Sequence, residues 1–241
     1  MTKSLKSLTG PLVVLAIGAL AVASVFVQTR GLGAAESAVA IPAPALDPGD
    51  ASGALQTAII AGGCFWGVQA VYQHTEGVVE AVSGYAGGTV EDPTYNQVSG
   101  GRTGHAEVVA IRYDPAKISY GKILQIFFSV AHDPTQLNRQ GPDVGTQYRS
   151  AIYTTTDEQK RVAAAYTEQL DAAGVYAAPI VTEIEPLKKF YPAEDYHQDY
   201  ATLHPTQPYI AYNDLPKIEN MKVMFSDYWR EEPKLVFAPA G

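Results

Sequence analysis

The chain has 241 residues, which suffices for one ordinary domain with extensions or for two small ones. Its 17 Lys+Arg against 25 Asp+Glu leave a formal net charge of −8, and a chain without a basic excess is a poor candidate for binding nucleic acid. A hydrophobic share of 46% supplies the apolar side chains of a core, which argues against a mainly disordered chain. The single cysteine, Cys64, excludes an intrachain disulfide and any metal site built from several cysteines.

Residues 1–30 have the composition of an export signal. Lys3 and Lys6 precede the apolar run PLVVLAIGALAVASVFV at positions 11–27. Ala21-Val22-Ala23 fits the small-x-small pattern of a cleavage site, while the full run reaches the lower length limit of a membrane-spanning helix. We therefore expect an exported, periplasmic or otherwise extracytoplasmic protein, whose first 30 residues are either a cleaved signal peptide or an N-terminal membrane anchor.

Residues 31–53 are rich in Ala, Pro, Gly and Ser and contain no aromatic residue or apolar period. Such a segment buries too little surface to offset its ordering entropy, so a flexible linker is predicted. The charges of the first 52 residues cancel, and the net charge therefore belongs to the following segment. Residues 54–241 are expected to form one folded domain.

Short strands and helices alternate from residue 55 onward. Strands are predicted over residues 57–61, 78–85, 105–113, 148–154 and 179–185, and helices over residues 64–74, 120–130, 157–173 and 193–203, before a terminal helix. Thr156 precedes one of these helices as a candidate N-cap. This mixture predicts an α+β fold, with a mixed sheet and helices packed against it in a ferredoxin-like two-layer sandwich.

Cys64 lies in the segment GCFWG at positions 63–67. A lone cysteine is most often a small buried apolar residue, but three features favour a nucleophile here. The flanking glycines permit close approach of a ligand, and a helix that begins at the cysteine stabilises a thiolate through its free N–H groups and its dipole. Phe65 and Trp66 cannot both face the core from adjacent helical positions, so one of them is expected to line a surface pocket beside the sulfur.

Glu107 interrupts an apolar strand pattern in the segment GHAEVV at positions 104–109. The strand alternates Ala106, Val108 and Ala110 with Glu107, Val109 and Ile111. Two interpretations stay open: a solvent-facing strand residue, or a partly buried carboxyl whose raised pKa lets it deliver a proton.

A third candidate region is DVGTQYRS at positions 143–150, which follows a long polar loop. Together with PTYN at positions 93–96 it supplies tyrosine hydroxyls for a pocket. No metal site is expected, because the five histidines show no ligand spacing and Glu194-x-x-His197 lacks the second copy that a di-iron site needs.

Six motifs occur together in one order: GCFWG at 63–67, GYAGG at 84–88, PTYNQV at 93–98, GHAEVV at 104–109, DVGTQYRSAIY at 143–153 and AEDYHQDY at 193–200. In order and spacing they resemble the A-type peptide methionine sulfoxide reductases, between Leu55 and Trp229. The resemblance implies an oxidoreductase that reduces methionine S-sulfoxide, free and in proteins, and so repairs proteins after oxidative stress.

The resemblance also implies a role for each matching residue. Cys64 maps to the nucleophile and Glu107 to the acid that protonates the sulfoxide oxygen. The substrate-binding positions map to Phe65, Trp66, Tyr95, Asp143 and Tyr148. Attack on the sulfoxide leaves Cys64 as a sulfenic acid, the first and reversible step of cysteine oxidation.

This chain departs from many relatives, which carry further cysteines near the C-terminus that reduce the sulfenic acid. Residues 203–241 contain none, so the chain resembles a single-cysteine form. No bound cofactor is expected; an external thiol, either a thioredoxin-like or glutaredoxin-like protein or a small thiol, is expected to regenerate Cys64.

The remaining expectations concern partners and rival functions. We expect oxidised proteins as substrates, a monomer, and contact with a membrane through residues 11–27 if these are not cleaved. Two alternatives stay open: a non-catalytic module that binds oxidised methionine segments, and a one-cysteine peroxidase.

Overall fold

The structure, a computed structural model, describes Met1, residues 37–49 and residues 53–237. The predicted signal peptide or anchor therefore lies outside the described residues, apart from Met1. Among the helices of the described ranges, none combines the length and the apolar character needed to cross a bilayer.

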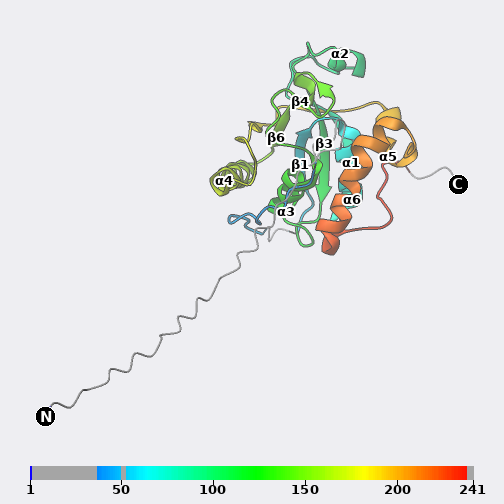
Figure 1. The fold of residues 1–241 in the computed structure, drawn as a ribbon. Coiled ribbons are helices and arrows are strands. Elements are labelled where there is room, and N and C mark those ends of the chain that lie inside the picture. The colour runs from blue at the N-terminus through cyan, green and yellow to red at the C-terminus, as the bar shows by residue number, and fades with distance from the viewer. Residues whose placement is uncertain (2–36, 50–52, 238–241) are drawn as a thin grey trace. The chain divides into compact units, whose positions relative to one another are not determined.

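A six-stranded sheet with the order β7-β6-β1-β3-β2-β8 forms the centre of the domain (Figure 1). Its strands are β1 Gln56–Gly62, β2 Val78–Ala86, β3 Ala106–Tyr113, β6 Ser150–Thr154, β7 Glu183–Pro186 and β8 Phe190–Pro192. All neighbours pair antiparallel except β6 and β7, which pair parallel. The inner order β6-β1-β3-β2 is that of a ferredoxin-like fold, so the predicted α+β class is confirmed.

The helices connect these strands. They are α1 Phe65–Gln73, α2 Tyr95–Ser99, α3 Tyr120–Ile126, α4 Asp157–Ala173, α5 Tyr200–Leu203 and α6 Leu215–Met224. Two π-helical turns, Phe127–Ala131 and Ile210–Asp214, extend α3 and precede α6. A short hairpin of β4 Arg139–Gln140 and β5 Asp143–Val144 lies outside the main sheet. Helix α4 has its predicted bounds, and the Thr156 hydroxyl accepts from the N–H of Gln159 as its N-cap.

The main core lies between one face of the sheet and α1, α3, α4 and α6. In β3 the side chains of Val109 and Ile111 belong to this core, whereas Val108 belongs to a smaller cluster on the opposite face. Because side chains alternate along a strand, Glu107 shares the helix-covered face with Val109. This register points a carboxyl toward the start of α1.

The helix predicted over residues 193–203 is wrong. The chain forms a 3₁₀ turn at Asp195–His197, then extended backbone at Gln198, a left-handed residue at Asp199 and only then α5. Buried non-local hydrogen bonds hold this break: Gln198 Nε2 donates to the Ser83 carbonyl over 2.9 Å, and Asp199 Oδ1 accepts from Gln73 Nε2 over 2.6 Å. Such bonds outweigh the local helical pattern. Two predicted strands are also shorter, since β6 begins at residue 150 and β7 at residue 183.

Residues 38–47 differ from the flexible linker expected there, because they lie along the domain. Val39 donates its N–H to the Ser129 carbonyl over 2.9 Å and accepts from the Ser129 hydroxyl over 2.6 Å. Tyr166 donates to the Pro42 carbonyl over 2.7 Å. An extended Ala/Pro segment has no internal hydrogen bonds, so its carbonyls are free to accept from side chains of the helices beneath.

Candidate active site

Cys64 is the N-cap residue of α1, at the turn that joins β1 to the helix. The turn depends on Gly63, whose φ of +87° favours glycine and whose Cβ would lie 2.5 Å from the Cβ of Gln140. The cysteine is 8% exposed, so its sulfur lies at the edge of the core rather than on an open surface.

The environment of Cys64 favours a thiol in the resting protein. Burial is the largest cause that raises its pKa, well above the ordinary value, and the nearby carboxylates of Glu107 and Asp214 raise it further. The N–H of Trp66 acts in the opposite direction. The helix N-terminus thus favours the thiolate as expected, but burial and three neighbouring carboxyl groups outweigh it.

Glu107 is the buried carboxyl of the two interpretations offered by the sequence. It is 2% exposed, and its Oε2 accepts the N–H of Phe65, the first residue of α1, over 3.1 Å. Burial raises its pKa to about 8, with smaller contributions from Asp143 and Asp214, while the Phe65 N–H lowers it. The carboxyl is therefore largely protonated at neutral pH and able to donate a proton.

The adjacent rings of Phe65 and Trp66 face different surroundings. Phe65 is buried, and its ring lies against Tyr85 with centroids 5.9 Å apart. Trp66 is only partly buried; it stacks on Tyr200 at 4.0 Å and meets Tyr209 edge-on at 6.0 Å. As the helical geometry required, one ring belongs to the core and the other reaches the surface beside Cys64.

Tyr95 and Tyr148 lie close to the reactive pair although they are far apart in the chain. Burial raises the pKa of Tyr95 to about 12, and the charges of Glu107 and Cys64 contribute. The pKa of Tyr148 is raised by burial first and by the same two groups. Both tyrosines thus interact electrostatically with the thiol and the acid, and their hydroxyls are hydrogen-bond donors of the kind that suits a polar substrate group.

Sequence reasoning missed two residues that come from the segment before α6. The Tyr209 hydroxyl donates a hydrogen bond to Asp143 Oδ2. Asp214 is fully buried, and its carboxylate packs against Gly67, where a Cβ would lie 2.2 Å from Oδ1. This contact explains the second glycine of the GCFWG motif. Neither residue belongs to a recognisable spacing pattern, so nothing in the sequence by itself indicated them.

The comparison with known proteins identifies this constellation. A sequence profile described as "Peptide methionine sulfoxide reductase" matches residues 56–229. The chain belongs to the peptide methionine sulfoxide reductase family. It is therefore an oxidoreductase that reduces methionine sulfoxide, and a purely non-catalytic binding module is not favoured.

Individual relatives agree with the family assignment. The chain is 60% identical over 186 residues to peptide methionine sulfoxide reductase MsrA 2 of Mesorhizobium japonicum, which covers 77% of this chain and 95% of the relative. It is 52% identical to a protein of the same name from Synechocystis sp., over 71% and 80% of the two chains. Among solved structures, methionine sulfoxide reductase A of Corynebacterium diphtheriae has a TM-score of 0.56 and 36% identity, covering 72% of this chain and 89% of that one. Reduced Mxr1 from Saccharomyces cerevisiae has a TM-score of 0.59 and 34% identity, covering 67% and 91%.

Glu194 links two tyrosines of the reductase site. Its carboxylate accepts from the Tyr85 hydroxyl over 2.9 Å and from the N–H of Tyr95 over 2.9 Å. Glu194, considered above only as part of a metal-binding pattern, therefore positions two tyrosines. Within the described ranges no group of three or more His, Cys, Asp or Glu side chains is arranged to hold a metal ion.

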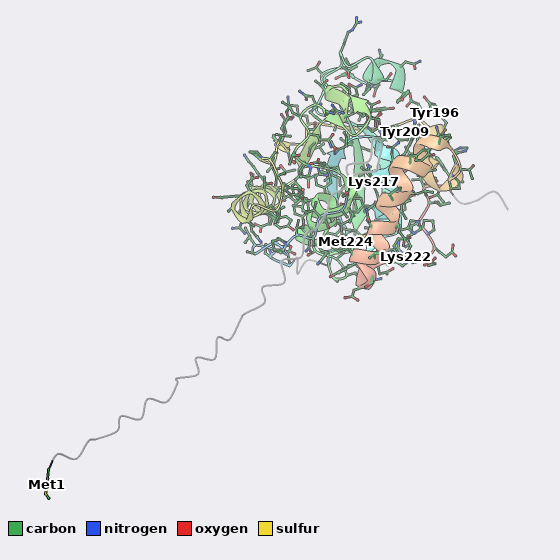
Figure 2. The ribbon with its side chains drawn as sticks, viewed as in Figure 1. Met1, Tyr196, Tyr209, Lys217, Lys222 and Met224 are labelled. Carbon is green, nitrogen blue, oxygen red and sulfur yellow. The ribbon has the colours of Figure 1, made fainter. Side chains whose placement is uncertain are left out.

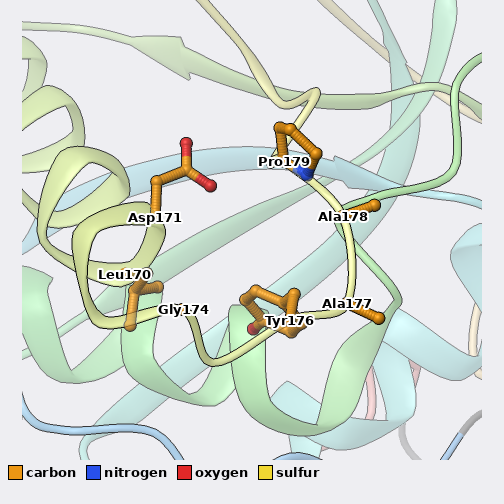
Figure 3. Close-up of a pocket in the computed structure, with 7 residues that line it drawn as sticks. All are labelled: Leu170, Asp171, Gly174, Tyr176, Ala177, Ala178 and Pro179. Atoms are coloured by element: carbon orange, nitrogen blue, oxygen red, sulfur yellow. The ribbon is translucent and has the colours of Figure 1, made fainter.

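A hollow lies under the loop that follows α4 in the reductase (Figure 3). It has a volume of about 430 Å³ and is lined by Leu170, Asp171, Gly174, Tyr176, Ala177, Ala178 and Pro179. The carboxylate of Asp171 already accepts the N–H of Ile180 over 2.9 Å. This hollow brings none of the reductase-site residues together.

Proposed function

We propose that the Cys64 sulfur attacks the sulfur of methionine S-sulfoxide while Glu107 protonates the sulfoxide oxygen. A sulfur–sulfur bond forms as the sulfur–oxygen bond breaks, and the oxygen leaves as water with the proton of Glu107 and the thiol proton. Water then adds to Cys64 and displaces methionine, which leaves a sulfenic acid and returns a proton to Glu107. The sum is thiol plus sulfoxide giving sulfenic acid plus thioether.

One observation carries this proposal: the hydrogen bond from the Phe65 N–H to Glu107. It joins the buried acid of β3 to the residue that directly follows Cys64, so acid and nucleophile meet at one helix end. Oxide is a poor leaving group, and a carboxyl with a pKa of about 8 retains the proton that the departing oxygen needs.

The aromatic side chains support the substrate assignment. Trp66, whose ring reaches the surface, suits the methyl group of the sulfoxide, with Phe65 as a buried apolar ring at the same helix end, and the hydroxyls of Tyr95 and Tyr148 suit the polar oxygen. We propose that the substrates are free and protein-bound methionine S-sulfoxide, and that the enzyme repairs oxidised proteins. Assays with each sulfoxide epimer test this directly; equal rates with both would contradict it.

We further propose that an external thiol regenerates the enzyme. With one cysteine in the chain, the sulfenic acid cannot form an internal disulfide. Two external thiol groups then supply the two electrons: they become a disulfide, Cys64 returns to the thiol, and the sulfenic oxygen leaves as water. A thioredoxin-like protein, a glutaredoxin-like protein and a small thiol are the candidates that a reconstituted assay compares.

Mass spectrometry tests the catalytic step. The protein is mixed with excess methionine sulfoxide peptide without reductant, and a dione reagent traps sulfenic acid. We expect one trapped group, on Cys64, and about one methionine formed per chain. Cys64→Ser is expected to form no methionine above background. Persistent turnover in this variant would contradict the proposal, and turnover of hydrogen peroxide in preference to the sulfoxide would favour the peroxidase.

We also propose that the catalytic domain functions outside the cytoplasm. The support is the sequence of residues 1–30, with two lysines before an apolar run. Fractionation and N-terminal sequencing of the native protein distinguish the anchor from the cleaved signal peptide, and a cytoplasmic protein with an intact soluble N-terminus would refute both. A monomer is expected on size-exclusion chromatography with light scattering.

A further inference from the structure

His197 lies behind the aromatic wall of the site and has no part in the reaction described above. It ends the 3₁₀ turn Asp195–His197 and is 3% exposed. Its ring is 4.3 Å from that of Tyr95 and 5.2 Å from that of Phe65, measured between centroids. The imidazole is thus wedged between its own turn and the starts of α1 and α2.

A hydrogen bond connects this imidazole to the indole of Trp66. The Trp66 Nε1–H donates to His197 Nδ1 over 3.3 Å. An indole N–H can only donate, so Nδ1 carries a lone pair and the proton of the neutral ring is assigned to Nε2. Only neutral His197 can make this bond, because a protonated ring has a donor at both nitrogens.

The other contacts of Trp66 do not fix the rotation of its ring. Stacking on Tyr200 has ring planes 15° apart and holds one face, and the edge contact with Tyr209 holds a side. Both contacts are apolar and tolerate sliding or rotation within the plane. The hydrogen bond from Nε1 to His197 is directional, and it therefore restrains the rotation that the ring contacts permit.

We propose that His197 is a positioning residue: its neutral Nδ1 fixes the indole of Trp66 as the wall of the sulfoxide methyl pocket, and protonation of the imidazole releases that wall. This inference rests on the proposed role of Trp66 in binding substrate. It predicts that the substrate affinity falls on acidification, even though the acid Glu107 becomes more fully protonated.

The surroundings of His197 set the pH at which the release occurs. Burial lowers the pKa of His197 below its ordinary value of 6.5, and the carboxylate of Glu194 acts in the opposite direction. The rings of Tyr95 and Tyr196 that face it are neutral at these pH values, and the facing Phe65 does not ionise. Nε2 is buried, and no described residue accepts a hydrogen bond from it, so a charged ring would be poorly solvated. The bond is therefore intact at neutral pH, and it is lost only as the pH falls through the lowered pKa of His197.

Two variants of the full chain separate the hydrogen bond from the bulk of the ring. His197→Phe keeps an aromatic ring but removes the acceptor, and we expect the KM for a methionine sulfoxide peptide to rise about 3- to 10-fold at pH 7.5 with kcat less affected. His197→Asn keeps an acceptor near the Nδ1 position and does not titrate. Its KM is expected to lie nearer that of the parent. Unlike the KM of the parent, it should not increase when the pH is lowered. The fluorescence of Trp66 is recorded in a Trp229→Phe background. It is expected to change over the same pH range as the KM when His197 is present, but not in His197→Asn.

The second histidine–tryptophan pair of the chain supplies a matched control. His74 stacks on Trp229 with centroids 4.6 Å apart, and His74→Asn is expected to leave the KM and its pH dependence unchanged. An unchanged KM in His197→Phe, or an acid rise retained in His197→Asn, would overturn the inference. If His197→Phe fails to fold, the pH profile of His197→Asn still decides. Trp66→Leu in the same assay separates the proposed role of Trp66 from that of His197. A parental KM in Trp66→Leu would refute the role of Trp66 in binding substrate. A raised KM in Trp66→Leu, with a parental KM in the His197 variants, would refute only the positioning role of His197.

Discussion

The two ends of helix α1 each carry a histidine beside a tryptophan, and the two pairs are built differently. At the start of the helix, Trp66 donates from Nε1 to buried His197, whose ring is tilted by 35°. At the end, His74 stacks flat on Trp229 with 3° between the planes, and the Trp229 Nε1–H donates to the exposed carboxylate of Glu231.

The charges around the two pairs differ in the same way. Near Trp229 they are paired at the surface, with Lys222 on Glu231 at 3.1 Å and Arg230 on Glu76 at 3.1 Å. Near Cys64 the carboxyls of Glu107 and Asp214 are buried, and the pKa of Glu107 is raised to about 8. Figure 2 shows Tyr209 and Lys222 at opposite ends of α6. Carboxylates that water screens form ordinary surface ion pairs, whereas carboxyls that are removed from water have shifted pKa values and can take part in proton transfer.

The sharpest way to break this comparison is Glu107→Gln. The amide keeps the shape but has no acidic proton, so kcat is expected to fall about 10²-fold or more. In the parent, activity is expected to decline as the pH rises through about 8, because Glu107 then loses the proton that it donates. Steady-state rates across pH measure both effects. Glu80→Gln, which changes an exposed carboxylate paired with Arg112, is the control and should leave the profile unaltered. A parental rate in the Glu107→Gln variant would remove the acid role from this residue.

A smaller effect is expected from Gly67→Ala. The added Cβ would lie 2.2 Å from Asp214 Oδ1 and so displace a carboxylate that acts on the Cys64 thiol. The better helix propensity of alanine, about 1 kcal/mol, offsets part of an overpacking cost of about 1–3 kcal/mol. We therefore expect a modest decrease in the free energy of unfolding, measured by urea denaturation. Because the displaced charge raises the pKa of Cys64 and of Glu107, both pKa values should fall, and the alkaline decline of kcat should move to lower pH. Gly100→Ala, at a position in the right-handed helical region where the nearest atom would lie 3.4 Å from the new Cβ, is the matched control. Equal losses in both variants would count against a specific contact at residue 67.

Asp143→Asn tests the electrostatic part of the comparison. The Asp143 charge raises the pKa of Glu107, although less than burial does. Removing that charge while keeping an acceptor for Tyr209 should lower the pKa of Glu107 and move the alkaline decline of kcat to lower pH. The pH profile measures the shift. A decline that stays in place would show that the charge of Asp143 has no part in setting this pKa.

The smallest effect is expected at the other end of α1. Lys222→Met removes the ion pair with Glu231 and leaves a side chain that can still cover the ring of Trp229. Because exposed ion pairs contribute little, kcat, KM and the midpoint of urea unfolding should all stay within experimental error of the parent. A marked loss of activity would mean that this end of the helix is coupled to the site and that the two ends do not differ in function as their charges suggest.

The sequence by itself determined the local features that depend on neighbouring residues. The strand and helix over residues 56–73, the bounds of α4 and the N-cap at Thr156 all follow from apolar periodicity and capping chemistry. Cys64 and Glu107 were also indicated, because a cysteine at a helix start and a carboxyl in an apolar strand are unusual. The order of the motifs pointed to the same two residues. These features needed no knowledge of distant contacts.

Only the tertiary structure decided the features that depend on residues far apart in the chain. Gln198 and Asp199 break a helical pattern because their buried side chains form hydrogen bonds with Ser83 and Gln73. These partners lie more than 100 positions away in the chain, so the neighbouring sequence does not reveal them. Asp214 contacts Gly67 in the same way, although the two residues are far apart in the sequence. The protonation states were decided there too. A helix N-terminus favours a thiolate, but burial beside carboxyls reverses that preference, so the lone cysteine identified from composition rests as a thiol beside a protonated acid.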